Sequence, residues 1–412
     1  MTPVSGKFGD ALAWIDRQGP AMADDVIAWS KVNSGSHNLD GLAHMGALVS
    51  EKFAALGAER RVIVLPPGDS VGLDGAVHPV PRGPVYAFTK RPEADRKVLL
   101  TGHIDTVFPA DHPFQEPRAL DDNTLNGPGV ADMKGGILVM LTALEALERS
   151  GAAGALGWEV LISSDEETGS LGSGPILAER ARIADFGMTY EPALADGTLA
   201  GARKGSGNFT IVLRGKAAHA GREFDKGRNA VTALAELIGD LNALNGRREG
   251  VTVNPAIVHG GTAPNIVPDL ALCRFNIRMA TGAEESWVMG EVAQIVARHD
   301  ARDGFSAELH GGINRPPKPL MAENEHLFRL LRGLGAEIGI EVAWTPTGGC
   351  CEGNNLAAAG LPNIDTLGVR GGKIHSDEEF VLLDSFAERA KLSALLLLSY
   401  ASGELDWPPK GA

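Results

Sequence analysis

A histidine and an aspartate lie two residues apart at the end of an apolar segment, in the stretch LLTGHIDTVFP at residues 99–109. In a β-strand, residues i and i+2 point to the same face, so His103 and Asp105 would lie side by side where the strand leaves its sheet. This arrangement suits a metal ligand and the carboxylate that orients it, because a ligating imidazole usually donates its second N–H to such a partner. A surface turn with a hydrogen-bonded histidine is the alternative that this fragment by itself leaves open.

Other residues of metal-ligating types follow further predicted strands or turns. Each has a structural explanation of its own, since an aspartate can cap a helix and adjacent glutamates can form a solvated turn. Together they supply several carboxylates and imidazoles at one edge of a predicted sheet without any cysteine, a donor set that suits Zn²⁺, Co²⁺ or Mn²⁺. The positions are Asp132, Glu166, Glu167, Glu191 and His375.

The charge of these candidates favours two metal ions over one. The four carboxylates among them would raise one another's pKa values sharply if they shared one cleft without compensation. Two divalent cations would balance their charge. The sequence therefore predicts a two-metal site.

The segments around these residues predict an α/β domain. Apolar strand patterns at residues 97–103 and 158–163 flank a helical pattern at 132–151. A strand, a helix and a strand in this order favour a mostly parallel sheet sandwiched by helices. In such sheets the chemistry lies at the carboxyl ends of the strands, which is where the candidate ligands fall.

The pattern changes after about residue 200. Residues 207–219, 270–279 and 305–312 read as strands, and 229–244 and 285–300 read as helices. Alternating strands with helices on one face are typical of a small α+β unit. We therefore predict an inserted α+β lid or dimerisation domain at 201–313, with a catalytic domain formed by 1–200 and 314–412.

Composition narrows the classes of function. The chain has 412 residues, a net charge of −14 and three cysteines. The negative charge argues against binding to nucleic acid or to an anionic membrane surface. Three cysteines do not build a disulfide framework, and the N-terminal residues lack the pattern of a signal peptide. We expect a cytoplasmic protein with a small-molecule substrate.

Several motifs occur together in an order typical of the M20 family of di-zinc metallohydrolases, and the chain resembles most its glutamate carboxypeptidase (carboxypeptidase G) branch. The resemblance implies a homodimeric zinc carboxypeptidase or amidohydrolase. Such an enzyme hydrolyses an amide bond in an N-acyl amino acid or small peptide and releases a C-terminal amino acid, with glutamate as one candidate. The motifs are GHIDTV, GVADMKGG, DEETGS, YEP, RKGS, GKAAHAG, GGTAPNIVPD and IHSDEE.

The resemblance also implies the arrangement of the metal ligands. Asp132 and a water would bridge two metal ions, most simply Zn²⁺, with Co²⁺ or Mn²⁺ as alternatives. One ion would also be held by His103 and Glu191, and the other by Glu167 and His375. The spacing of Glu166 and Glu167 shows that one can bind metal while the other faces the water, but it does not say which.

Catalytic and substrate-binding roles follow from the same resemblance. Glu166 would be the general base, and Asp105 would orient His103. His219, from the inserted domain, would stabilise the oxyanion in the active site of the partner subunit. Substrate binding would use Arg278, Asn265 and Arg315, the last for a side-chain carboxylate.

One loop departs from the family pattern. In TGGCCEGNN, residues 347–355, Cys350, Cys351 and Glu352 stand where relatives usually have a small residue, a serine or threonine, and an aspartate. We expect this change to affect specificity rather than metal chemistry. The alternatives are an N-acyl amino acid deacylase or a di- or tripeptidase of the same family, and a non-catalytic ligand-binding member.

Overall fold

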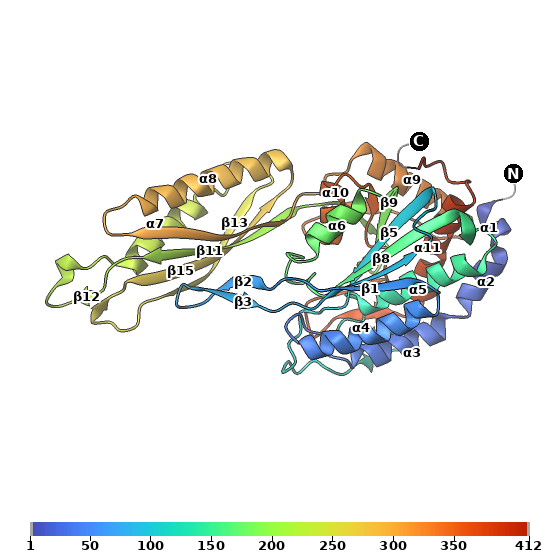
Figure 1. The fold of residues 1–412 in the computed structure, drawn as a ribbon, viewed down its shortest axis with the longest axis horizontal. Helices are drawn as coiled ribbons and strands as arrows, with labels where there is room; N and C mark the ends of the chain where they lie inside the picture. Colours follow the sequence, from blue (N-terminus) through green and yellow to red (C-terminus); the bar gives the residue numbers. More distant parts are fainter. Residues whose placement is uncertain (1–2, 410–412) are drawn as a thin grey trace.

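The computed structural model describes residues 3–409, which form two lobes joined at one end (Figure 1). The larger lobe is built on a six-stranded sheet in which β8, β5, β9 and β18 are parallel and β4 and β1 complete one edge in antiparallel pairs. The mixed, mostly parallel sheet predicted from the sequence is confirmed. In spatial order, the strands are β1 (Glu59–Ile63), β4 (Val85–Lys90), β8 (Leu156–Ser163), β5 (Arg96–His103), β9 (Phe186–Thr189) and β18 (Asn363–Ile364).

Helices cover both faces of this sheet. Because strand side chains alternate, Val98 and Leu100 of β5 pack into one apolar cluster and Leu99 packs into the cluster on the opposite face. The larger cluster lies under α2 (Gly9–Asp16), α3 (Gly19–Ser30), α4 (Leu39–Ala54), α5 (Lys134–Arg149), α9 (Ala322–Glu337) and α11 (Ser385–Ala401). The smaller cluster lies under α6 (Gly174–Ala181) and α10 (Glu352–Ala358).

The smaller lobe is a four-stranded antiparallel sheet with two helices on one face. Its strands, in spatial order, are β13 (Thr252–Gly260), β15 (Leu270–Met279), β11 (Gly205–Arg214) and β16 (Ser306–Arg315), and its helices are α7 (Ala230–Asn242) and α8 (Gly282–Asp300). Cys273, Phe275 and Ile277 of β15 join the core under the helices, as their alternation predicts. The exact domain limits, 201 and 313, stay a prediction.

The edge strand β13 was not among the strands that the sequence predicted. Pro255 interrupts its pattern, and the pairing register with β15 shifts between Pro255 and Ile257. Proline cannot donate to a strand ladder, so it is confined to edges and bulges. The strand therefore lacks the regular alternation by which β15 could be recognised.

A hairpin connects the two lobes on the face of the small sheet opposite its helices (Figure 1). Its strands are β2 (Gly68–Val71) and β3 (Val77–Val80), in a region where the sequence analysis predicts no strand. Val71 packs against Val212 and Leu272 of the small sheet. The guanidinium of Arg274 donates to the Val71 carbonyl at 2.8 Å. These contacts tie the hairpin, which belongs to the large lobe, to the small one.

Short elements complete the structure. They are α1 (Val4–Lys7), β6 (Arg118–Ala119), β7 (Thr124–Asn126), β10 (Leu199–Arg203), β12 (Ala218–His219), β14 (Ile266–Val267), β17 (Trp344–Thr347), β19 (Gly371–Gly372), β20 (Phe380–Leu382) and the 3₁₀ turns Ala153–Ala155 and Phe224–Lys226. None of the helices within residues 3–409 combines the length and the apolar character that a membrane span requires.

Candidate metal centre and active site

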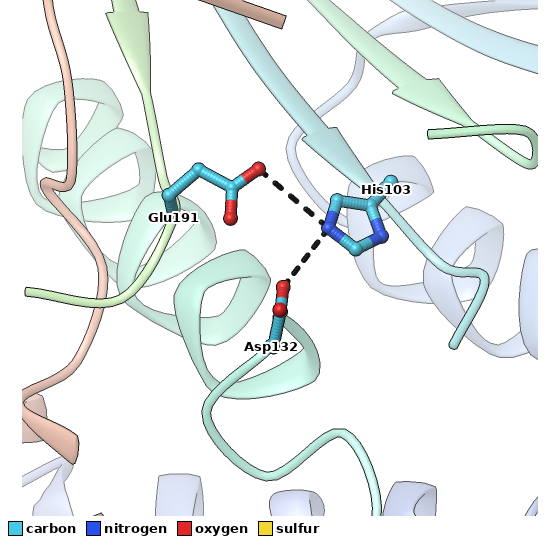
Figure 2. Close-up of side chains that lie close together, drawn as sticks. All are labelled: His103, Asp132 and Glu191. Atoms are coloured by element: carbon cyan, nitrogen blue, oxygen red, sulfur yellow. Dashed lines mark hydrogen bonds and ion pairs between the residues drawn. The ribbon is translucent and has the colours of Figure 1, made fainter. Parts of the chain in front are cut away.

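The candidate ligands come from the carboxyl ends of adjacent parallel strands and from two loops. His103 is the last residue of β5, and Glu191 follows the end of β9. Glu167 lies in the loop after β8, and His375 lies in the loop between β19 and β20. Asp132 precedes α5, which begins at Lys134. Asp132 therefore does not cap that helix, and its carboxylate is directed at His103 (Figure 2).

The two carboxylate oxygens of Asp132 face two different histidines. Oδ1 lies 3.1 Å from His103 Nε2, and Oδ2 lies 3.2 Å from His375 Nε2. Glu191 Oε1 is 3.7 Å from His103 Nε2, and Glu167 Oε2 is 3.2 Å from His375 Nε2. The result is two groups of possible ligands, each with its donor atoms within 4.8 Å of one another, that share Asp132.

The electrostatics of these groups fit bound cations. Burial and the charge of Asp132 raise the pKa of Glu167 to about 8, and the same two causes raise the pKa of Glu191 well above its ordinary range. Crowded carboxylates of this kind release their protons readily once divalent cations neutralise them. The oxygen and imidazole donors are those that Zn²⁺, Co²⁺ and Mn²⁺ accept. The residues present therefore fit two divalent ions.

Close backbone packing brings the ligand loops together. A Cβ on Gly136, in the first turn of α5, would lie 2.1 Å from the carbonyl oxygen of Tyr190, next to Glu191. Only glycine lets the helix approach that strand end so closely. His375 has φ of 64°, in the left-handed region that non-glycine residues rarely adopt. Unusual backbone conformations of this kind cluster at functional sites.

Asp105 connects the end of β5 to the acidic loop. His103 Nδ1 lies 2.9 Å from the Asp105 carbonyl oxygen, and since a carbonyl only accepts, Nδ1 carries the proton and Nε2 is left for a metal. The Asp105 carboxylate lies 3.4 Å from the same ring nitrogen. It also accepts the backbone N–H groups of Glu166 and Glu167 at 3.1 and 3.0 Å. One buried aspartate thus contacts a histidine ligand and both glutamates.

Glu379 is a contributor that sequence reasoning missed. Its buried carboxylate accepts the backbone N–H groups of Gly129, Ala131 and Asp132 at 3.1, 3.0 and 3.0 Å. These bonds fix the loop that delivers the shared aspartate. The sequence signal was its position in IHSDEE, shortly after His375, where it reads as one more exposed acid.

Glu166 and Arg315 form an ion pair beside the metal ligands. Arg315 Nη2 lies 2.5 Å from Glu166 Oε1 and 3.1 Å from the Glu166 carbonyl oxygen. Its Nη1 donates to Asn355 Oδ1 at 2.5 Å. Arg315 is 1% exposed. The predicted general base therefore has a buried cationic partner that the sequence did not indicate.

Asp132, Glu167, Glu191 and His375 form one wall of a pocket of about 610 Å³ between the lobes. Arg203, Arg278 and Arg315 contribute cationic groups to it. Arg278 contacts neutral atoms, with Nε 3.0 Å from Asn276 Oδ1 and Nη1 3.3 Å from Cys350 Sγ. Within residues 3–409, Arg278 forms no ion pair with a carboxylate, so its charge faces the pocket uncompensated.

In the loop of Cys350, Cys351 and Glu352, which departs from the family pattern, the structure explains the second and third residues. The Cys351 thiol accepts the backbone N–H of Gly353 at 3.2 Å, so it caps the N-terminus of α10 as a serine or threonine hydroxyl would. Glu352 Oε1 accepts the Ser163 hydroxyl at 2.6 Å, while its Oε2 has no hydrogen-bond partner among residues 3–409. Burial raises the pKa of Glu352 to about 8.

Two predicted site residues lie elsewhere in the same chain. His219 and Asn265 are exposed and adjoin each other, since Ala220 donates to the Asn265 carbonyl at 3.0 Å. His219 ends β12 and Asn265 immediately precedes β14, and these two strands pair at the end of the small lobe far from the large sheet (Figure 1). Within one chain, the structure does not bring them to the metal ligands.

Carboxylates and histidines grouped around a shared aspartate at the carboxyl ends of parallel strands fit the class of metal-dependent hydrolases. Residues 99–399 match the peptidase family M20/M25/M40, and the chain belongs to this family.

Individual relatives agree with this assignment. Carboxypeptidase G2 of Pseudomonas sp. strain RS-16 is 28% identical over 75% of each chain. Succinyl-diaminopimelate desuccinylase of Verminephrobacter eiseniae is 26% identical over 70% of this chain and 75% of its own. The structure of a tripeptidase from Staphylococcus aureus superimposes with a TM-score of 0.72 at 22% identity, covering 93% of this chain and 99% of that one. The family resemblance noted in the sequence is confirmed.

Proposed function

We propose that this enzyme hydrolyses the amide bond of N-acyl amino acids or small peptides and releases the C-terminal amino acid. The observation that carries the proposal is one pocket with two chemical sides. One side holds two groups of metal ligands that share Asp132, next to Glu166. The other side holds Arg278, whose charge has no carboxylate partner among the described residues.

The metal side of the pocket would hold two divalent ions, for which we propose Zn²⁺. His103, Asp132 and Glu191 would hold one ion, and Asp132, Glu167 and His375 the other. When bound, such a pair lowers the pKa of a water and polarises the scissile carbonyl.

Glu166 is the residue that we propose to move the proton. It lies in the pocket beside Glu167. Arg315 binds its Oε1, whereas its Oε2 makes no hydrogen bond within residues 3–409. Oε2 would accept a proton from the attacking water and then deliver it to the leaving amine. The carboxylate thereby acts first as a base and then as an acid.

Arg278 would bind the C-terminal carboxylate of the substrate. A planar guanidinium makes two parallel hydrogen bonds to a carboxylate, which gives both charge and orientation. Its position on β15 of the small lobe would place the scissile amide between this anchor and the metal ligands.

We further propose that the enzyme acts as a homodimer. His219 would stabilise the oxyanion in the partner's active site, with Asn265 beside it contacting substrate. Their exposure at the far end of the small lobe supports an action on a second chain. The cytoplasm is the proposed compartment, because all three cysteines are free thiols.

Deacylation of N-acyl amino acids and cleavage of di- or tripeptides would use the same residues. Because the named relatives include both a carboxypeptidase and a desuccinylase, the acyl side of the substrate is the part to be determined. A non-catalytic binding role has less support. The chain has a histidine or a carboxylate at every candidate ligand position, and a glutamate at the position of the proposed base, Glu166.

Release of free amino acids from a panel of substrates tests the proposal. The panel pairs varied acyl and aroyl groups with varied amino acids, together with di- and tripeptides, and Zn²⁺ or Co²⁺ is added. We expect hydrolysis of at least one N-acyl amino acid, abolished by a chelator and restored by metal. Each substrate is also offered as its C-terminal amide, which should be a much poorer substrate. A metal-loaded enzyme that cleaves nothing on the panel would contradict the proposal.

A further inference from the structure

The three arginines of the pocket differ in the side chains of this chain with which they pair. Arg203 is paired with Asp365, with Nε and Nη2 at 2.6 and 3.0 Å from its two carboxylate oxygens. Arg315 is paired with Glu166. Of the three, Arg278 alone contacts only neutral groups among the described residues.

Arg315 is buried, and its guanidinium contacts Glu166. As the last residue of β16, it lies where the small lobe rejoins the large one. One nitrogen, Nη2, contacts both the main-chain oxygen and the carboxylate of Glu166, while Nη1 is held by Asn355 on α10. The guanidinium thus links its own strand to two other segments of the chain.

These contacts fix Glu166 at both its backbone and its side chain. Asp105 accepts its backbone N–H, and Arg315 holds its carbonyl oxygen and Oε1. A charge-assisted bond to one carboxylate oxygen restricts the rotation of the side chain and leaves the other oxygen directed away. Proton transfer depends on such placement within hydrogen-bond reach of the water.

Both terminal nitrogens of Arg315 are engaged and its side chain is 1% exposed, so a substrate carboxylate that paired with Arg315 would compete with Glu166 to replace it at the guanidinium. That exchange would leave a buried glutamate without its cation, which is strongly unfavourable. It would also remove the support of the proton-transferring residue at the moment of reaction.

We propose that Arg315 is a positioning residue for Glu166 and does not bind the side-chain carboxylate of the substrate. This inference rests on the proposed function and replaces the substrate-binding role that the sequence predicted for Arg315. A second consequence concerns specificity. Arg278 is left as the one arginine of the pocket free to bind a carboxylate, so the released amino acid need not be acidic.

Steady-state kinetics on a matched pair of substrates test the proposal. N-benzoyl-glutamate and N-benzoyl-glutamine, or the same pair with the acyl group that the panel selects, differ only in the side-chain carboxylate. We expect Arg315→Gln to lower kcat by the same factor, about 10- to 100-fold, for both substrates, with little change in KM. Arg278→Gln is the matched control and should raise KM for both. A loss confined to the glutamate substrate and expressed in KM would overturn the proposal.

A double variant provides a second, independent test. If Arg315 acts through Glu166, then Arg315→Gln should cost little more once Glu166→Gln has been introduced. Additive losses would show that Arg315 acts on something else. Bound metal is measured for every variant, and we expect both ions to be retained.

Two further measurements keep the proposal testable if Arg315→Gln folds poorly or if no substrate is found. Asn355→Ala removes one contact of the Arg315 guanidinium without removing its charge. It should lower kcat less than Arg315→Gln does, and by the same factor for the glutamate and the glutamine substrate. A crystal structure of metal-loaded Arg315→Gln should show the Glu166 carboxylate displaced, whatever the substrate. An unmoved Glu166 would refute the inference, whereas an inactive wild-type enzyme would refute the proposed function.

Discussion

The buried group of candidate metal ligands and the tip of the small lobe differ in how firmly the chain holds them. His103, Asp132 and Glu191 are 0%, 5% and 7% exposed, and buried hydrogen bonds donated to Asp105 and Glu379 fix their surroundings. His219 and Asn265, in contrast, are exposed on a two-stranded ribbon. A metal site needs ligands preorganised within one chain, because mutual repulsion opposes their assembly. A residue that completes a partner's site must instead remain accessible.

The two lobes also differ in the kind of functional residue that each contributes. The large lobe buries charged side chains, which costs free energy, and hydrogen bonds and ion pairs around these side chains offset that cost. The small lobe offers Arg278 from a sheet face and His219 from its far end. The four predictions below test this division, beginning with the largest expected effect.

Exchanging either glutamate of the acidic pair should separate proton transfer from metal binding. Glu166→Gln should lower kcat by roughly 10²–10⁴-fold while both ions stay bound, because proton transfer is lost and every ligand remains. Glu167→Gln should lose metal, because it removes a ligand. Metal analysis beside kinetics checks both. If the first variant lost its metal and the second kept it, the two roles would have to be exchanged.

Mixing two inactive variants should restore activity if the small lobe acts on a partner. Glu166→Ala and His219→Ala should each be nearly inactive, since removing an oxyanion donor alone costs about 10²–10³-fold. After subunit exchange at equal amounts, about half of the dimers are hybrids with one intact site, so activity should recover to about a quarter of wild type.

The control for this mixture is a demonstration of exchange with differently tagged subunits. Without recovery despite exchange, His219 does not act on a partner. A monomer in light scattering would lead to the same conclusion.

Removing the support of the Asp132 loop should weaken metal binding without removing a ligand. Glu379→Gln would set an amide N–H₂ against backbone N–H groups that now bind carboxylate oxygens, so we expect metal affinity to fall by about 10- to 100-fold. Competition with a chelating dye measures it. Glu378→Gln is the control, because the exposed Glu378 carboxylate pairs with Lys373 at the surface and not with the Asp132 loop. Equal affinities for the two variants would assign Glu379 no role in the site.

The smallest effect concerns stability and pH. Burial raises the pKa of Glu352 from 4.5 to about 8 in the folded state, so between these values the folded chain binds a proton that the unfolded chain has lost. The contribution of Glu352 to stability should therefore fall as pH rises, by about 1.4 kcal/mol per pH unit at most.

Urea unfolding of the metal-free protein at pH 5.5 and 7 measures this slope. Glu352→Gln should be less sensitive to pH than wild type and relatively more stable at pH 7. Parallel pH profiles for the two proteins would mean that Glu352 is ionised in the folded state.

Local patterns in the sequence were sufficient for much of the fold and for the list of candidate ligands. The alternation of β15 and the apolar run of β5 are properties of a few consecutive residues, so they can be read without knowing what packs against them. Ligand types at strand ends indicated a two-metal site for the same reason. The assignment of each residue's role needed the family resemblance, and those roles stay predictions.

Tertiary structure alone decided which distant residues meet. Arg315 and Glu166 are 149 positions apart, and Glu379 and Asp132 are 247 apart, so no local pattern links them. The sequence analysis predicts no strand for the hairpin of β2 and β3, because its apolar residue Val71 packs against the other lobe. Periodicity reports the environment along one segment, whereas ion pairs between segments depend on how the whole chain packs. The candidate metal ligands could thus be listed from the sequence, but the contacts that hold them and the proposed base in place could not.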